Sequence, residues 1–167
     1  MEIAIFFHSR LDICRLCFNC IGQESGRGGR NGKLKGGEKM KRSEIYKCAE
    51  CGLTFEVTTG CNCPVSCCGK EMKLMQAQTA DYKQEKHVPF PESVNGGMRV
   101  TVGKEMPHPM LEAHHIEWIE VINGPYVNRR YLKPGEEPRA DFYVPLQKGM
   151  IVREFCNIHG LWEYEVK

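Results

Sequence analysis

The eight residues HIEWIEVI at 115–122, followed by Asn123-Gly124-Pro125, carry a clear strand-and-turn signal. β-Branched and aromatic side chains dominate the run, and Asn-Gly-Pro is typical of a turn. Similar runs, separated by Gly, Pro and Asn, lie at Met98–Val102, Ala140–Val144 and Met150–Phe155. No window of twelve residues shows the periodicity of an amphipathic helix. Residues 78–167 are therefore predicted to form an all-β domain, an antiparallel β-sandwich of the immunoglobulin-like kind.

The same stretch holds a set of histidines in local groups. EKH occupies 85–87, HPM occupies 108–110 with His114 and His115 shortly behind it, and CNIHG occupies 156–160. Cys156 is the only cysteine after residue 68. Several imidazoles with one thiolate suit a redox metal such as iron or copper, whereas zinc normally needs only four ligands. The pattern predicts a metal centre in the sandwich.

A second candidate site lies ahead of it, in residues 40–77. Cys48-Ala-Glu-Cys51 is followed by the adjacent pair Cys67-Cys68 and then a glycine. Two such pairs can complete a tetrahedron of sulfur around zinc or iron. A segment this short rarely folds on a hydrophobic core alone, so metal binding would supply folding free energy. Cys61 and Cys63 lie between the pairs and are interpreted as spare thiols.

The first 39 residues differ in composition from the rest. Residues 25–39 contain six glycines and five Lys/Arg, and such a segment cannot bury enough apolar surface to fold. Cys14, Cys17 and Cys20 upstream lack the fourth ligand and trailing proline of an iron–sulfur motif. KGGEKM at 35–40 can be encoded by a purine-rich bacterial ribosome-binding site before an ATG codon. The prediction is that residues 1–39 are a disordered or mistranslated leader and that the native chain starts at Met40.

Charge and hydropathy exclude two classes of protein. The net charge of +2 conceals a basic leader, because residues 1–39 hold seven Lys/Arg against four Asp/Glu while the remainder holds 16 against 17. The domains therefore lack the basic footprint of a nucleic-acid-binding protein. No apolar run approaches the roughly 18 residues of a membrane span. Clustered cysteines in a chain that is not exported favour metal binding over disulfides, and a cytoplasmic location is expected.

From Met40 onward the sequence resembles the desulfoferrodoxins, the two-iron superoxide reductases. The spacing C-x2-C-x15-C-C-G is similar to that of desulforedoxin, a small iron-tetrathiolate fold. EKHVP at 85–89, HPM with a histidine six residues after His108, IEWIE at 116–120 and CNIHGLW at 156–162 follow in the order of the family. Each motif alone is a weak signal, but all of them in order behind the cysteine pairs are specific.

The resemblance implies a role for each matched residue. It makes Glu85 the carboxylate that can take the sixth position on the oxidised metal, and Lys86 the cation beside the open site. His115 has no matching role and is expected not to be a ligand. The implied iron ligands are Cys48, Cys51, Cys67 and Cys68 for a ferric first site, and His87, His108, His114 and His159 with axial Cys156 for a ferrous/ferric second site.

The resemblance also implies a function: one-electron reduction of superoxide to hydrogen peroxide, with electrons from a rubredoxin-like donor, in a homodimer. The first site is expected to be mainly structural, with an electron relay as the alternative. Two other classes stay open on the residues alone. A pure electron carrier would have both metals closed to small anions, and a zinc-binding structural module would have no redox activity.

Overall fold

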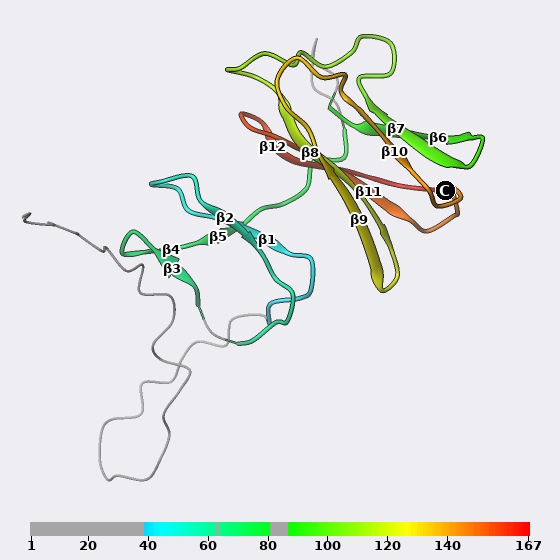
Figure 1. Ribbon diagram of the computed structural model, residues 1–167. Helices are drawn as coiled ribbons and strands as arrows, with labels where there is room; N and C mark the ends of the chain where they lie inside the picture. The colour runs from blue at the N-terminus through cyan, green and yellow to red at the C-terminus, as the bar shows by residue number, and fades with distance from the viewer. Residues whose placement is uncertain (1–38, 63, 81–86) are drawn as a thin grey trace, which may run out of the picture. The chain divides into compact units, whose positions relative to one another are not determined.

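The computed structural model describes residues 39–62, 64–80 and 87–167, which form two compact units that divide between Met75 and Gln76 (Figure 1). These residues contain strands and turns but no helix, so the all-β prediction is confirmed. In this part of the chain, no helical segment has the length and apolar character that crossing a bilayer requires. Residues 1–38, Cys63, Glu85 and Lys86 lie outside the described residues, and the start at Met40 stays a prediction.

The second unit is a sandwich of two antiparallel sheets. One sheet has the order β10-β7-β6 and the other the order β12-β11-β8-β9. The strands are β6 (Pro89–Val94), β7 (Gly97–Val102), β8 (Ile116–Asn123), β9 (Tyr126–Tyr131), β10 (Arg139–Phe142), β11 (Ile151–Cys156) and β12 (Gly160–Glu165).

Alternating side chains of both sheets fill the space between them. Met98, Val100 and Val102 of β7 point inward with no exposed surface, and they meet Ile119 and Val121 of β8. This period of two is the pattern expected when one face of a strand is buried and the other is not. The hairpins turn at Gly96, between β6 and β7, and at Gly124, between β8 and β9, both with positive φ. The second of these is the turn predicted at Asn123-Gly124-Pro125.

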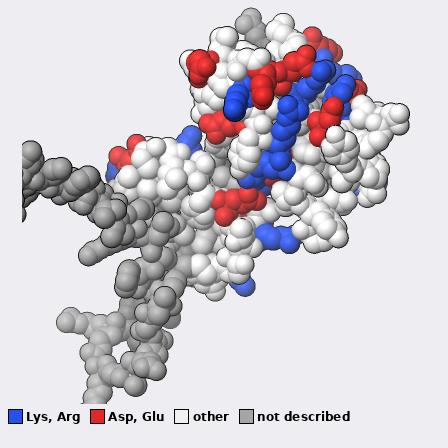
Figure 2. All heavy atoms as spheres, in the orientation of Figure 1, with Lys and Arg blue, Asp and Glu red and all other residues white. Residues whose placement is uncertain are grey.

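The outer side of the four-stranded sheet carries a buried ion-pair group. Glu120 of β8 has no exposed surface and accepts hydrogen bonds from Arg129 of β9, with Nε at 2.7 Å, and from Arg153 of β11, with Nε at 2.5 Å. Arg129 also covers the ring of Trp118, which stacks on Phe155. Charged side chains elsewhere are mixed in sign, as Figure 2 shows for one face.

The first unit is built from short strands around its cysteines. β1 (Ile45–Lys47) lies between β2 (Thr54–Glu56) and β5 (Lys73–Leu74), and β3 (Ser66–Cys67) pairs with β4 (Lys70–Glu71). The β3–β4 turn consists of Cys68 and Gly69, both with positive φ. A two-residue hairpin with both φ values positive favours glycine, which explains the glycine behind the cysteine pair.

The interior of this unit is small, and its own thiols form much of it. Cys48, Cys67 and Met72 are buried, with Tyr46, Phe55 and Val65 packed against them. Residues 40–44 belong to the unit, because the Met40 amide donates to the Cys61 carbonyl at 3.2 Å and the Ser43 amide to the Val57 carbonyl at 2.8 Å. Cys61 is in a disulfide, which corrects its interpretation as a spare thiol.

Candidate metal centres

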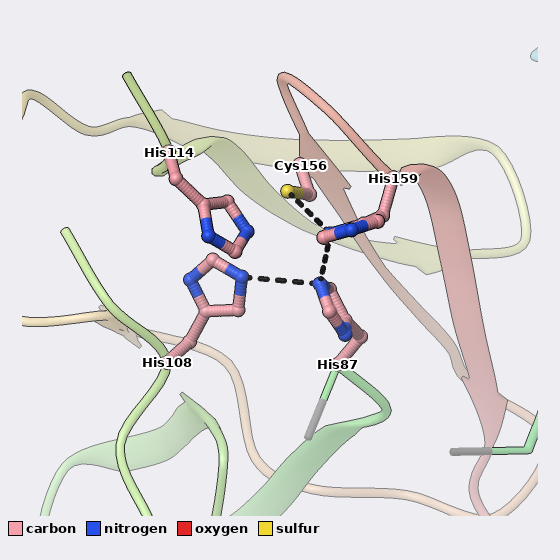
Figure 3. A group of neighbouring side chains, drawn as sticks. All are labelled: His87, His108, His114, Cys156 and His159. Carbon is pink, nitrogen blue, oxygen red and sulfur yellow. Dashed lines mark hydrogen bonds between the residues drawn. The ribbon is translucent and has the colours of Figure 1, made fainter. Parts of the chain in front are cut away.

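Five side chains converge at one end of the sandwich and form what we call the histidine–cysteine centre (Figure 3). His87 lies two residues before β6 begins, and His108 and His114 lie in the loop between β7 and β8. Cys156 is the last residue of β11, and His159 lies in the turn before β12. One potential ligand atom from each lies within 4.8 Å of all the others. The structure therefore brings together all five residues predicted for the second site.

The contacts within this centre are those of donors around a common point. His87 Nε2 lies 2.9 Å from His159 Nδ1 and 3.1 Å from His108 Nε2, and Cys156 Sγ lies 3.6 Å from His159 Nδ1. A single imidazole nitrogen carries either one proton or one lone pair, so His87 Nε2 cannot satisfy both neighbouring nitrogens as donor and acceptor at once. A cation shared by the lone pairs resolves this conflict.

His108 shows how one of these rings is set for metal binding. Its Nδ1 lies 2.6 Å from the Pro109 carbonyl, which can only accept a hydrogen bond, so the proton belongs on Nδ1 and the lone pair on Nε2 faces the group. Burial, aided by the neighbouring His87, lowers the pKa of His108 from 6.5 to about 4. The ring is therefore neutral at physiological pH, as a metal ligand must be.

Residues outside the centre hold its rings in place. The indole of Trp162 on β12 stacks on His87 with ring centroids 4.6 Å apart and planes 15° from parallel. Gln78, bridged through its backbone to β12, donates its side-chain amide to the His159 carbonyl at 2.9 Å. These supports fix ligand orientation before a metal arrives.

Cys156 is aimed by an irregularity in the sheet. Along β11 and β8, Phe155 pairs with Trp118 but Cys156 pairs with Ile116, so one residue of β8 is left over. A bulge of this kind re-aims the side chain that follows it. Cys156 is wholly buried and belongs to the hydrophobic core, so its sulfur approaches the centre from inside the protein.

The histidine–cysteine centre is closed on the inner side and open on the outer side. His87 and His108 are each 3% exposed and Cys156 is 0% exposed, whereas His114 is half-buried and His159 is exposed. Four imidazoles and a thiolate suit iron, and the described residues of the centre supply one donor fewer than an octahedral ion accepts. The residues present therefore fit iron.

The four predicted ligands of the first site also meet, and they form what we call the tetracysteine site. The sulfurs of Cys48, Cys51, Cys67 and Cys68 all lie within 4.8 Å of one another, with Cys51 and Cys67 3.6 Å apart and Cys67 and Cys68 3.8 Å apart. All four thiols are free. Four sulfurs in one cluster, with no further donor among the described residues of the group, fit a closed tetrahedral metal.

The thiols of the tetracysteine site differ in acidity for physical reasons. Hydrogen bonds from the backbone N–H groups of Cys51 and Glu50 lower the pKa of Cys48 to about 7. The pKa of Cys67 is raised, first because its thiol donates to Cys51 and second because it is buried. The pKa of Cys68 is also raised, again through Cys51. The Cys48 thiolate therefore forms readily, whereas Cys67 and Cys68 resist ionisation, and a bound cation would favour the thiolate form of both.

The remaining predicted residues have different outcomes. His115 lies outside the five-residue centre, and its ring Nδ1 contacts the Leu111 carbonyl at 3.2 Å. Glu85 and Lys86 lie outside the described residues, so their roles stay predictions. Sequence reasoning missed the supporting residues Gln78 and Trp162. Of these, Trp162 stands at the end of the CNIHGLW run and was visible there.

An all-β fold with a group of four histidines and one cysteine, and a separate group of four cysteines, defines a class of metal-binding proteins with two sites, one of which suits a redox metal such as iron. A family model described as Desulfoferrodoxin matches residues 79–165. The desulfoferrodoxin homolog of Methanothermobacter thermautotrophicus is 47% identical over 120 residues, which cover 72% of this chain and 96% of the relative. The chain therefore belongs to the desulfoferrodoxin family, whose members bind iron.

Two further comparisons are with superoxide reductases. The superoxide reductase of Thermococcus kodakarensis is 39% identical over 106 residues, covering 53% of this chain and 92% of the relative. The crystal structure of the superoxide reductase from Treponema pallidum superposes with a TM-score of 0.57 at 24% identity, covering 73% of this chain and 97% of that one. The structural likeness at this identity concerns the fold.

Proposed function

We propose that this protein is a superoxide reductase, which reduces superoxide by one electron to hydrogen peroxide at the histidine–cysteine centre. The observation that carries the proposal is the shape of that centre: five converging donors, buried on the side of Cys156 and open on the side of His159. A closed electron carrier has no use for an open position, and a structural zinc site has no use for a fifth ligand.

Bound ferrous iron would supply the electron and become ferric, and two protons complete the conversion of superoxide to hydrogen peroxide. The protein's part is to hold the metal through His87, His108, His114, His159 and Cys156. The His108 ring keeps its proton on Nδ1, bonded to the Pro109 carbonyl, and leaves Nε2 as the donor. The buried Cys156 side excludes water from the inner half of the site.

Two residues that directly precede His87 in the chain are proposed to act on the substrate side. Lys86 would attract the superoxide anion and raise its encounter rate. Glu85 would supply a carboxylate for the open position between turnovers. Both roles are supported by the match of EKHVP at 85–89 to the family.

The proposal extends to the rest of the molecule. A rubredoxin-like protein would return the electron, the protein would be a cytoplasmic homodimer, and residues 40–77 and 78–167 would serve as a structural iron domain and a catalytic domain. The metal of the tetracysteine site would mainly hold its unit together, because two of the thiols that would bind it, those of Cys48 and Cys67, are also part of the interior of that unit.

The test is a product count. Iron-loaded full-length protein, reduced without air, receives a known pulse of superoxide while iron oxidation is followed. One hydrogen peroxide for each superoxide, no O2 and a matching loss of Fe2+ are expected. Half that peroxide together with O2 would show a dismutase, and no reaction would return the choice to an electron carrier or a zinc module. Azide or cyanide that left the spectrum unchanged would favour the carrier.

A further inference from the structure

Three of the five converging residues lie in or next to two neighbouring turns. His114 lies in the segment 111–115, just before β8, and Cys156 and His159 lie at the two ends of the turn between β11 and β12. The first segment is closed on itself, since the amides of Leu111 and His114 each donate to the other's carbonyl, at 2.8 and 3.0 Å. Its distance from the second turn must be set by other contacts.

Asn157 makes those contacts. Its backbone N–H donates to the His115 carbonyl at 3.1 Å, which continues the β8–β11 pairing one step past Ile116 and Cys156. Its side-chain Oδ1 accepts from the His115 N–H at 3.0 Å, and its Nδ2 donates to the Ala113 carbonyl at 3.1 Å. Three hydrogen bonds from one residue thus bracket His114 on both sides.

The chemistry of the amide side chain fits this position in one orientation only. The oxygen meets a donor and the nitrogen meets an acceptor, so a flipped amide would oppose N–H to N–H and oxygen to oxygen. The same Oδ1 lies 3.9 Å from Cys156 Sγ, which places the amide directly beside the thiolate ligand as well. The side chain of Asn157 therefore takes the place of a backbone partner for Ala113 and His115, at the point where β8 and β11 separate and the metal site begins.

We propose that Asn157 is a positioning residue of the histidine–cysteine centre: it acts as a clamp that fixes the distance between His114 on one turn and Cys156 and His159 on the other. The proposal rests on the proposed metal site, but not on its reaction with superoxide. It also accounts for His115, whose two backbone groups are the partners that Asn157 holds and whose ring closes on Leu111.

The test is a titration of the metal-free full-length protein with Co2+, whose visible spectrum distinguishes a site of four thiolates from a site of four imidazoles and one thiolate. Removal of a residue that orients ligands typically weakens metal binding by about 10–100-fold. Asn157→Ala should raise the Co2+ dissociation constant of the histidine–cysteine centre by at least about tenfold and shift its absorption bands.

The tetracysteine site in the same chain is the internal control and should be unchanged. Asn128→Ala, which removes an amide on β9 away from the centre, is the matched control and should leave both sites unchanged.

Asn157→Asp separates positioning from charge and decides the question if Asn157→Ala does not fold. Aspartate keeps the acceptor for the His115 N–H but turns a second oxygen toward the Ala113 carbonyl, so the clamp predicts weaker binding and shifted bands. A residue that acted through charge alone would bind Co2+ more tightly with the negative side chain. Unshifted bands with unchanged or tighter binding in Asn157→Asp would overturn the proposal, and so would equal losses at both sites in Asn157→Ala. A protein that passed this test but left superoxide unreduced would refute only the proposed function.

Discussion

Acidification of the metal-free protein should destabilise the second unit through one buried imidazole, that of His108. Burial lowers the pKa of this ring from 6.5 to about 4, so the folded chain keeps it neutral at pH values where the unfolded chain is protonated. Above pH 6.5 the His108 ring is neutral in both states, and its contribution to the free energy of unfolding is fully present. Between pH 6.5 and about 4 the unfolded chain alone binds the proton, so the free energy of unfolding falls as the pH drops. Below about pH 4 the ring is protonated in both states.

The size of the effect follows from the width of that window. One proton bound only by the unfolded state changes the free energy of unfolding by about 1.4 kcal/mol for each pH unit. Across the window this amounts to about 3 kcal/mol, a large part of the 5–15 kcal/mol that stabilises a typical domain.

The assay is denaturant unfolding of the metal-free full-length protein at a series of pH values within the window. Both tryptophans, Trp118 and Trp162, lie in the second unit, so their fluorescence reports on it alone. His108→Gln is the comparison, because its amide does not titrate and the carboxylates that do are common to both proteins. The free energy of unfolding should fall less steeply with acid in the variant, by about 1.4 kcal/mol for each pH unit. Parallel curves for the two proteins would refute the reasoning.

Four other outcomes follow from the site and the fold. Lys86→Ala should slow the bimolecular reaction with superoxide and flatten its salt dependence; an unchanged rate and salt slope would remove Lys86 from the mechanism. Cys156→Ser should abolish the thiolate-to-iron absorption band and activity together, and retention of both would show the thiolate ligand to be misassigned. Glu120→Gln should lower the free energy of unfolding by about 3–5 kcal/mol, because the buried Arg153 and the half-buried Arg129 lose their counter-charge. Asp141→Asn, at an exposed ion pair, should cost less than about 1 kcal/mol, and equal losses would contradict the difference in burial. Chelation of the metal in the tetracysteine site should unfold the first unit and leave tryptophan fluorescence native, whereas a changed fluorescence would show that the units unfold together.

The sequence revealed strands that are rich in buried apolar side chains and concealed one that is not. β7, β8, β10 and β11 appear within one or two residues of the predicted runs, because each contributes apolar side chains to the core. In β7 and β10 these side chains alternate with exposed or half-buried ones, whereas β8 and β11 are buried on both faces along most of their length. β9 reads YVNRRY and is half-buried or exposed along its whole length, so no alternation marks it. It is a strand because it pairs with β8 along its length, a fact that only the tertiary structure contains.

The same division applies to the metal centres. Ligand positions were predictable because metal donors are chemically rare and their spacing is conspicuous, as at Cys48 and Cys51 or in the run from Cys156 to His159. The residues that support the ligands, Asn157 and Trp162, were not predictable. Asparagine and tryptophan have many ordinary structural roles, and only the contacts in the structure show that these two hold metal ligands in place. The disulfide at Cys61 was missed for another reason: the expectation that a non-exported chain has free thiols favoured a spare cysteine.

The place of Cys156 in the hydrophobic core has a further consequence. Its side chain packs in the same cluster as Ile116 and Val152, so the atom that would donate electron density to the iron is also part of the interior that holds the two sheets together. A substitution that loosens this interior would move the sulfur and change its overlap with the metal. The wavelength of the thiolate-to-iron absorption band in the iron-loaded protein would then report on how well the sandwich is packed. Pressure or a core mutation distant from the metal would change that wavelength.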